Sequence, residues 1–213
     1  MDYHAFFHPS VSDFEFSKRA YLDARPGVSF DYIATSALTL DTTDIDNARI
    51  LLLQRATNAP NPNKWEPPGG LCDDSDKTII HGAERELEQQ AGLWTFCVSG
   101  PVGDPYFFTL DDGKKVCQFN FAVVARPAGD FPLKMEINPG NPRALAFTGS
   151  DAPLVVQLDS EKHQDYVWAT EDQVKAKKVN DVVLDFISEE VARTVLLTFQ
   201  HVRENWGNYE DQV

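Results

Sequence analysis

The chain has 213 residues, of which 42% are hydrophobic and 24% charged, and a formal net charge of −14 at pH 7. This length predicts one domain with additions and a sizeable core. The acidic balance argues against a nucleic-acid surface, because affinity for polyanions comes from clustered Lys and Arg, and no basic run is present. No stretch approaches the roughly 18 apolar residues of a membrane span. We therefore expect a cytoplasmic protein with neither nucleic acid nor membrane as partner.

Residues 1–27 are aromatic and polar and end at Pro26 and Gly27. We interpret them as an extension that packs on the domain or on a partner, and residues 28–213 as the domain itself. Within that domain, residues 29–40 and 49–56 are typical of strands, and an Asp-rich turn joins them.

The stretch 65–93 combines features of a ligand-binding loop and a helix. Pro67 and Pro68 disfavour a helix, whereas Gly69 and Gly70 permit a tight loop whose backbone can approach a ligand. Apolar residues then recur at helical spacing over 77–91, ahead of a glycine suited to end the helix.

The polar residues of this helix fall into two groups when they are placed at about 100° per residue. Arg85, Glu86, Gln89 and Gln90 share the flank beside the apolar stripe, facing the Gly-Gly loop. Glu84 and Glu88 are expected to point to water.

Residues 94–100 predict a strand, and 105–110 with 115–125 predict a hairpin around Asp111-Asp112-Gly113, because Asp-Gly is a strong turn signal. Gln118 and Asn120 alternate with apolar residues on the second hairpin strand. They face either a substrate cleft or solvent.

Residues 125–153 form a long insertion rich in Pro and Gly. It is either a lid or specificity loop, or a surface insertion without ligand contact. Further on, Thr170 is suited to cap a short helix. Residues 185–205 predict an amphipathic helix whose apolar face packs on the core or on a second copy, which leaves a homodimer open.

Cys72, Cys97 and Cys117 are odd in number and contain no CxxC pair, so the sequence indicates neither a zinc site nor a disulfide framework. A reducing compartment fits this usage. We interpret Cys72 as a small packed residue rather than a reactive thiol.

The end of the helix resembles the signature of the Nudix hydrolases, Arg-Glu-aliphatic-x-Glu-Glu-x-Gly-aliphatic. The matching residues are Arg85, Glu86, Leu87, Glu88, Gln89, Gln90, Ala91, Gly92 and Leu93. The resemblance is close here and looser over roughly residues 30 to 205. It implies an α/β fold, an α/β/α sandwich with a mixed central sheet. It also implies Mg²⁺ or Mn²⁺, held by helix carboxylates against a diphosphate that water attacks.

The resemblance also suggests roles for individual residues. The Gly70 carbonyl, Glu86, Gln89 and Gln90 would surround the metal ion, and Arg85 would orient the carboxylates. Family loops like residues 158–174 often supply the base, so Glu161 is the first candidate to assist water, with His163 and Asp165 behind it. The candidate substrate-binding residues are Trp65, Glu66, Gly69, Gly70, His163 and Trp168. For Trp65 and Trp168, packing in the core is the alternative.

The sequence departs from the family at two points. Gln89 and Gln90 stand where the Glu-Glu pair would be, so the metal ligands lose the charge that offsets cation dehydration, and affinity should fall. Such near-isosteric changes fit an engineered inactivation as well as a natural loss. In addition, one extra residue precedes Arg85, which leaves Asp76 at the position of the family's first Glu.

Three hypotheses follow for function. The first is a hydrolase of a diphosphate-linked small molecule, such as a nucleoside diphosphate joined to another group, impaired by Gln89 and Gln90. The second is a non-hydrolytic isomerase or cyclase that uses acid/base residues. The third is a domain that only binds its ligand.

Overall fold

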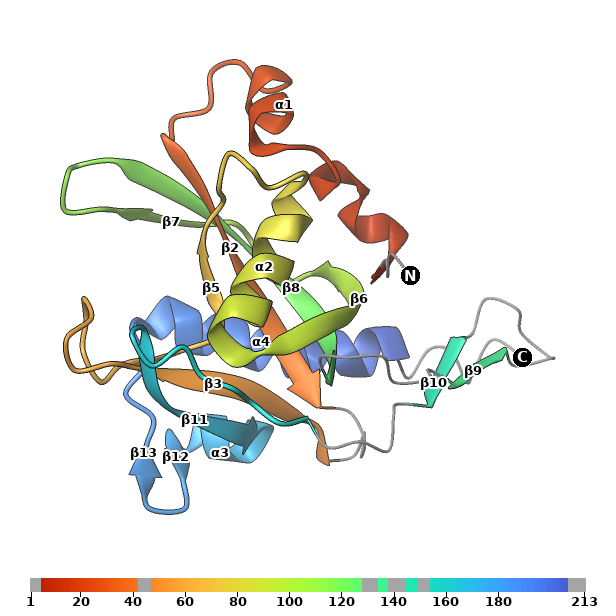
Figure 1. Ribbon diagram of the computed structural model, residues 1–213, viewed down its shortest axis with the longest axis vertical. Helices are drawn as coiled ribbons and strands as arrows, with labels where there is room; N and C mark the ends of the chain where they lie inside the picture. The colour runs from red at the N-terminus through yellow and green to blue at the C-terminus, as the bar shows by residue number, and fades with distance from the viewer. Residues whose placement is uncertain (1–4, 42–46, 128–133, 138–144, 149–153, 207–213) are drawn as a thin grey trace.

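The computed structural model describes residues 5–41, 47–127, 134–137, 145–148 and 154–206, with the backbone alone considered at 126–148, 205 and 206. A large mixed sheet forms its centre (Figure 1). Its strands are β1 (Phe6–Phe7), β2 (Tyr32–Asp41), β3 (Arg49–Arg55), β4 (Trp65–Glu66), β5 (Gly69–Leu71), β6 (Leu93–Pro101), β7 (Tyr106–Thr109), β8 (Lys115–Pro127) and β11 (His163–Thr170).

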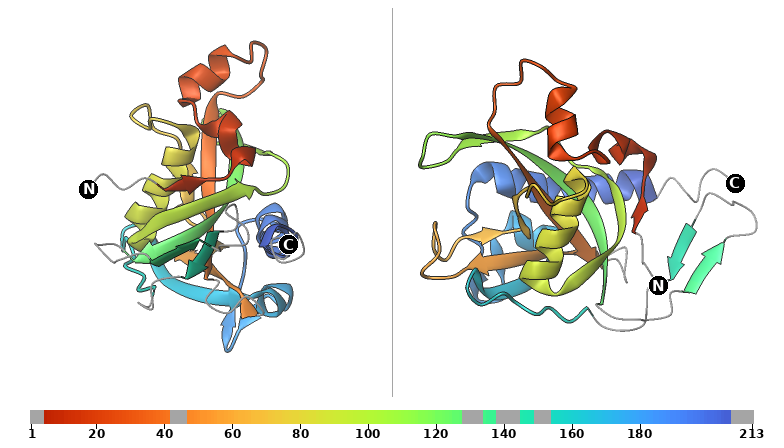
Figure 2. Two further views of the ribbon diagram at one scale, coloured as in Figure 1. Left: turned by 90° about the vertical axis from the view of Figure 1, so that its right-hand side faces the viewer. Right: turned by 45° about the horizontal axis from the view of Figure 1, so that its top comes forward.

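The helices are η1 (Pro9–Phe14), α1 (Lys18–Asp23), α2 (Ile79–Ala91), α3 (Glu171–Lys175) and α4 (Glu189–Trp206). Helix α2 covers one face of the sheet and α4 the other, as the left view of Figure 2 shows. The architecture is therefore the α/β/α sandwich with a mixed sheet that the sequence predicts.

The sheet follows the order β1-β6-β8-β2-β3-β11, with β4, β5 and β7 paired at its sides. Strand β2 is parallel to β8 and antiparallel to β3 and β5. Strands β7 and β8 form the predicted hairpin, and Gly113 adopts φ +83°, a left-handed conformation that favours glycine in the turn. Strand β2 begins at Tyr32, later than the predicted start at residue 29.

Alternating side chains of the central strands supply two cores, because successive residues of a strand point to opposite faces. Phe119 and Phe121 of β8 pack in the core that α2 covers, together with Leu87. Leu38 of β2 and Ala122 of β8 pack in the core that α4 covers. Gln118 and Asn120 therefore lie on the α4 face of the sheet.

Residues 5–27 pack against the domain. Strand β1 runs parallel to β6 at the edge of the sheet. Val11 and Tyr21 are buried in the core under α2. The assignment of these residues as an extension stays a prediction.

The predicted insertion at 125–153 falls largely outside the described residues, as does the turn at 42–46. Within it, β9 (Lys134–Ile137) and β10 (Leu145–Thr148) pair antiparallel as a separate two-stranded sheet. Another small pair, β12 (Lys178–Val179) and β13 (Val182–Val183), precedes α4. The alternatives of lid and surface insertion stay open.

Helix boundaries follow the capping residues. Thr78 caps α2 by accepting a hydrogen bond from the His81 amide, so the helix begins at Ile79 rather than at residue 77. Gly92 ends it at φ +64°, as predicted. Thr170 caps α3, also as predicted.

Helix α4 begins at Glu189, later than predicted, because the preceding backbone pairs with β4. The Trp65 amide donates to the Asp185 carbonyl at 2.9 Å, and the Ile187 amide donates to the Trp65 carbonyl at 3.0 Å. Val195 and Phe199 bury the apolar face of α4 in the protein's own core. The core interpretation of that face is therefore correct.

Candidate functional site

The first turns of α2 are held to the preceding loop by a buried ion pair. Asp76 is 4% exposed and accepts two hydrogen bonds from Arg85, at 2.9 Å to Oδ1 and 3.0 Å to Oδ2. Arg85 also donates to Glu86 Oε1 at 2.6 Å. The hydrogen bond with Asp76 is the main cause that raises the pKa of Arg85, against the opposing effect of burial. Asp76 thus pairs with Arg85 despite the extra residue between them.

The second carboxylate oxygen of Glu86 accepts a hydrogen bond from an amide side chain. Gln90 Nε2 donates to Glu86 Oε2 at 2.6 Å and to the Gly69 carbonyl at 2.8 Å, while Gln90 Oε1 accepts from the Gly69 amide at 3.1 Å. Reversing the amide would set its oxygen against two acceptors and its nitrogen against a donor. The NH₂ group of Gln90 therefore faces Glu86.

A lysine completes the surroundings of Glu86. The loop before β11 docks on the end of α2, since the Gln157 amide donates to the Ala91 carbonyl at 2.8 Å. Lys162 Nζ then lies 3.6 Å from Glu86 Oε2. Its neighbour Glu161, the predicted base, is exposed, and its role stays a prediction. The sequence analysis did not single out Lys162, although it is adjacent to that candidate.

The donor set around Glu86 does not fit the magnesium centre that the resemblance implies. In the part of the chain that the structure describes, no three or more His, Cys, Asp or Glu side chains converge as metal ligands. Glu86 faces the cations Arg85 and Lys162 and the Gln90 NH₂ group, whereas Mg²⁺ is usually held by one or two carboxylates together with waters and substrate phosphates. Gln89 is exposed, and its Oε1 accepts from Arg85 at 3.3 Å.

Gly70 allows the close approach of β5 to this network. A Cβ atom added at Gly70 would lie 2.7 Å from Glu86 Oε1. The Gly-Gly backbone therefore approaches the helix carboxylate, and its predicted approach to a ligand stays a prediction.

A cavity of about 770 Å³ opens beside β5, between the β7–β8 hairpin and the start of α4. Glu66, Gly69 and Gly70, three of the predicted substrate-binding residues, lie on its wall. Further lining comes from the start of β2, the β7–β8 hairpin, the β3–β4 loop and the start of α4, with residues Ser36, Arg55, Asn61, Tyr106, Phe108, Gln118, Ser188 and Val191.

At the cavity wall, the carboxylate of Glu66 contacts two side chains, an arginine and a histidine. Arg55 NH1 lies 2.6 Å from Glu66 Oε1, and His163 Nε2 lies 3.2 Å from the same oxygen. His163 is only 2% exposed, and among the described residues its Nδ1 has no hydrogen-bond partner. It lies behind Glu66 and does not line the cavity, contrary to its predicted contact with substrate.

Both candidate tryptophans are also turned away from the cavity. Trp65 is 0% exposed and packs in the core under α4. Because successive strand residues face opposite sides, Glu66 reaches the cavity while Trp65 does not. Trp168 is partly buried against the core under α2. Trp65 therefore follows the core alternative and has no exposed surface for a ligand, whereas a ligand contact of the partly buried Trp168 stays a prediction.

The two outward glutamates of α2 differ from each other. Glu88 is exposed, as predicted, and accepts a hydrogen bond from the Trp94 indole at 3.1 Å. Glu84 is half-buried, and burial raises its pKa to about 7. The expectation that Glu84 points freely to water is therefore wrong.

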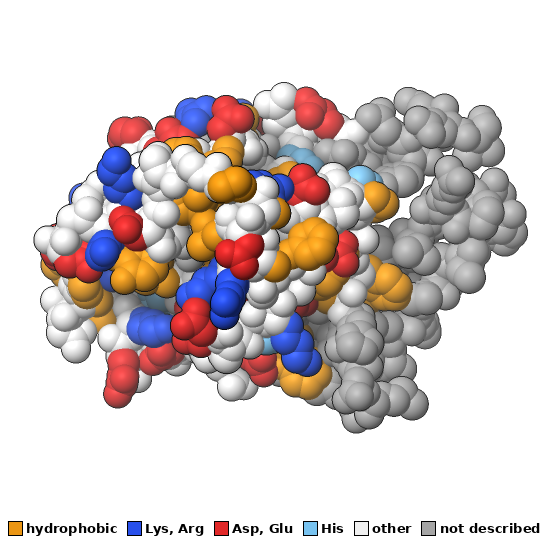
Figure 3. All heavy atoms as spheres, turned by 90° about the horizontal axis from the view of Figure 1, so that it is seen from above, with side chains coloured by type: hydrophobic (Ala, Val, Ile, Leu, Met, Phe, Trp, Pro, Cys, Tyr) orange, Lys and Arg blue, Asp and Glu red, His pale blue; other side chains and the backbone are white. Residues whose placement is uncertain are grey.

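Acidic and basic side chains are interspersed with hydrophobic ones on the face shown in Figure 3. Of the described helices, none is long and apolar enough to cross a membrane.

A family model described as "NUDIX domain" matches residues 34–188. The Nudix domain of NrtR from Shewanella oneidensis, solved with ADP ribose, has a TM-score of 0.53 at 13% identity, covering 88% of this chain and 99% of that one. An Ap4A hydrolase of C. elegans, solved as a binary complex, has a TM-score of 0.51 at 18% identity, covering 82% and 98%. At these identities the likeness shows the fold. A search of curated proteins gives no match.

Proposed function

Because this chain belongs to the NUDIX domain family, we propose that it is a Nudix-type hydrolase of a diphosphate-linked small molecule whose hydrolysis is strongly attenuated by Gln89 and Gln90. The observation that carries the proposal is the Gln90 amide between Gly69 and Glu86. It supplies hydrogen-bond donors where a hydrolytic centre needs cation ligands.

The electrostatics around Glu86 support the same proposal. Arg85, Lys162 and Gln90 already compensate the charge of this carboxylate. A divalent cation would have to displace them and would gain a single carboxylate in return. We therefore expect weak binding of Mg²⁺ or Mn²⁺.

The cavity supports the ligand part of the proposal. Its volume of about 770 Å³ lies in the range typical of small-molecule sites, and it borders the same glycines that contact the helix network. ADP ribose, which is bound in one of the two similar structures, and Ap4A, which the name of the other enzyme gives as its substrate, suggest nucleotide-linked diphosphates for a first panel.

The test compares the formation of phosphate monoester products, such as AMP, from that panel by the native protein and by the double variant Gln89→Glu with Gln90→Glu, with Mg²⁺, with Mn²⁺ and with chelator. We expect the double variant to be faster by about 10²- to 10³-fold in metal, the size of effect typical of one group that stabilises transition-state charge. Adding Glu86→Gln to the double variant is the matched control and should abolish the gain.

Mn²⁺ binding, measured by electron paramagnetic resonance, gives a second readout that does not depend on turnover. The double variant should bind Mn²⁺ at least about tenfold more tightly than the native chain, because two carboxylates replace two amides. Equal Mn²⁺ affinity and equal rates in both proteins would refute the attenuating role of the glutamines. Absence of both turnover and pyrophosphate binding in both proteins would refute the diphosphate part.

The non-hydrolytic alternative has one observation in its favour, the contact of Glu66 with the buried His163 at the cavity wall. Acid/base chemistry at this pair would proceed at the same rate in chelator, and it would be lost in Glu66→Gln but not in Glu86→Gln. A domain that only binds would bind its ligand saturably and show no turnover in either variant.

We also propose a reducing, cytoplasmic location. The supporting observation is that Cys72, Cys97 and Cys117 are free and buried. Burial raises the pKa of Cys72 to about 12, which supports its interpretation as a packed residue.

A further inference from the structure

Lys162 is held beside Glu86 by the backbone of its own loop. The Lys162 amide donates to the Asp159 carbonyl at 3.0 Å, and the Lys162 carbonyl accepts from the Ala56 amide at 2.9 Å. The Asp159 amide in turn donates to the Gln90 carbonyl at 3.3 Å. These bonds tie the loop to α2 and to the end of β3 without using the lysine side chain. A substitution at residue 162 should therefore leave the loop in place.

Of the two cations that contact Glu86, Lys162 is the one that keeps donors for a ligand. A guanidinium has five N–H groups, and Arg85 directs all of them at protein oxygens. The acceptors are the side chains of Asp76, Glu86 and Gln89 and the carbonyl of Leu71. An ammonium has three N–H groups. Within the described part of the chain, Lys162 Nζ pairs with Glu86 Oε2 alone, at 3.6 Å, and its side chain is 48% exposed.

Gln89 adds a second set of outward donors. Its Oε1 accepts from Arg85 at 3.3 Å, which turns its NH₂ group away from the guanidinium. Gln89 is exposed, and among the described residues its Nε2 has no hydrogen-bond partner. Arg85 NH1 also donates to Glu86 Oε1, so Gln89 lies on the Oε1 side of this carboxylate and Lys162 on the Oε2 side. Donors thus flank Glu86 on both sides.

The large cavity itself does not favour an anion. Its charged lining residues are one cation and three carboxylates, Arg55, Glu66, Asp111 and Asp112. Arg55 is already paired with Glu66 at 2.6 Å. Gly70 belongs to the cavity wall and also lies against Glu86. An anionic group of a ligand is therefore better placed at this edge, where Lys162 supplies a cation.

We propose that Lys162 takes the place of the divalent cation beside Glu86, so that the chain binds a phosphate or diphosphate anion at the Gly70 edge without a metal ion. Lys162 Nζ and Gln89 Nε2 donate to the anion, while Glu86 holds the ammonium in position. Lysine binds phosphate in this way as a point charge. The inference rests on the proposed function for the anion being part of a diphosphate-linked molecule.

The test titrates inorganic pyrophosphate by calorimetry, in chelator, into the native protein and into variants. We expect the native protein to bind, and Lys162→Met to lower the affinity about tenfold, the size of roughly one hydrogen bond to a charged group. Lys162→Arg keeps the charge and should retain most of the affinity. Gln89→Met removes an uncharged donor and should lower the affinity less, about threefold.

The same variant should act in the opposite direction on a cation. Mn²⁺ affinity, measured by electron paramagnetic resonance in titrations without pyrophosphate, should rise about tenfold in Lys162→Met, because a positive charge beside Glu86 is removed. Damage to the fold would lower both affinities. Opposite changes in the two affinities therefore separate the charge of Lys162 from a structural role.

Lys114→Met is the matched control. Lys114 has a side chain that is 49% exposed and lies 3.7 Å from Asp31 Oδ1, so its ion pair closely resembles that of Lys162 with Glu86. This variant should bind pyrophosphate and Mn²⁺ as the native protein does.

The proposal is overturned if the native protein binds no pyrophosphate in chelator, or if Lys162→Met leaves pyrophosphate affinity unchanged or lowers the affinity for Mn²⁺. These results come from a chain that keeps Gln89 and Gln90, without metal during the pyrophosphate titration. The proposed function fails instead on product formation and Mn²⁺ binding by the double variant Gln89→Glu with Gln90→Glu, so the two failures are distinguishable.

Discussion

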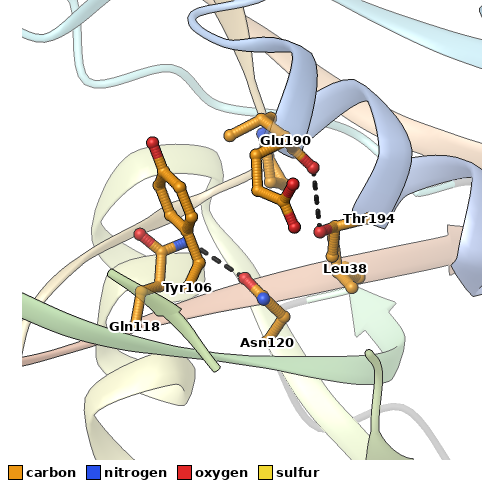
Figure 4. Close-up of a pocket in the computed structure, with 8 residues that line it drawn as sticks. Leu38, Tyr106, Gln118, Asn120, Glu190 and Thr194 are labelled. Carbon is orange, nitrogen blue, oxygen red and sulfur yellow. Dashed lines mark hydrogen bonds between the residues drawn. The ribbon is translucent and has the colours of Figure 1, made fainter. Parts of the chain in front are cut away.

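The two sides of β5 differ in how their polar groups are satisfied. On the α2 side, Glu86, Gln90, Arg85 and the Gly69 backbone hydrogen-bond to one another. On the α4 side, Asn120 Oδ1 accepts from Ser36 Oγ and from Gln118 Nε2; Gln118 lines the cavity, and Asn120 lines a smaller recess beside it (Figure 4). Strand β5 thus separates two polar networks. The groups on the α2 side hydrogen-bond to one another, whereas the side chains on the α4 side border a cavity that a ligand can enter.

The largest expected loss of stability comes from removing Arg85 from the network on the α2 side. Arg85→Met leaves the buried Asp76 without its arginine and Glu86 with Lys162 alone, and removing one partner of a buried pair costs about 3–5 kcal/mol. Urea unfolding measures the loss. Arg193→Met is the control, because its pair with Glu190 is exposed to solvent and should contribute little to stability. A loss at Arg85 no larger than at Arg193 contradicts a closed network.

A second way to break the closed side is Gln90→Glu. The variant sets two carboxylates together and leaves the Gly69 carbonyl without its donor, at a cost on the order of 1–3 kcal/mol. Thermal unfolding should show a lower Tm that Mg²⁺ raises, because a cation bound only to the folded state stabilises it. The native Tm should not respond to Mg²⁺. Gln89→Glu, at an exposed position, is the control and should lower Tm less.

Gly70→Ala tests how closely β5 approaches Glu86. The added Cβ would lie 2.7 Å from Glu86 Oε1, and overpacking of this kind costs about 1–3 kcal/mol. The cost should shrink when Glu86→Ala is also present, because the clash partner is gone. Urea unfolding of the two single variants and the double variant gives the coupling. Strict additivity would show that Glu86 is not what Gly70 accommodates.

The smallest expected effect is a pH dependence of stability that arises from Glu84, a residue of α2 outside the hydrogen-bonded network of Glu86. Burial raises the pKa of Glu84 from 4.5 to about 7, so the folded state holds this proton more tightly than the unfolded chain. Stability should therefore fall as pH rises between these two values and stay lower above them.

Glu84→Gln should remove this dependence and raise Tm more at pH 8 than at pH 5, as differential scanning calorimetry would show. Glu88→Gln, from the same helix but exposed, should show no such difference. If the two variants behave alike at both pH values, the pH dependence does not arise from Glu84.

The fold was predictable where periodicity and turn chemistry agree. The β7–β8 hairpin follows from Asp112-Gly113, and the end of α2 follows from Gly92. Both glycines have positive φ values, which glycine tolerates. The start of α4 was not predictable, because it depends on backbone pairing with Trp65, a residue far away in sequence. Local capping signals cannot reveal such a partner.

The candidate site was predictable in its helical part. Helical spacing places Arg85, Glu86 and Gln90 on one flank, as the hydrogen bonds among them require. Lys162 was missed because the docking of its loop on α2 uses backbone contacts, which carry no sequence signal. The exclusion of Trp65 from the cavity depends on strand pairing, which orients neighbouring side chains to opposite faces.

The segment from Pro67 to Gly70 connects the wall of the cavity to the network around Glu86. Pro67 borders both the recess and the cavity, and Gly70 contacts Glu86. Three extended residues span at most about 10–11 Å. Because the segment is this short, the cavity wall at Pro67 and the close contact at Gly70 cannot move independently of each other.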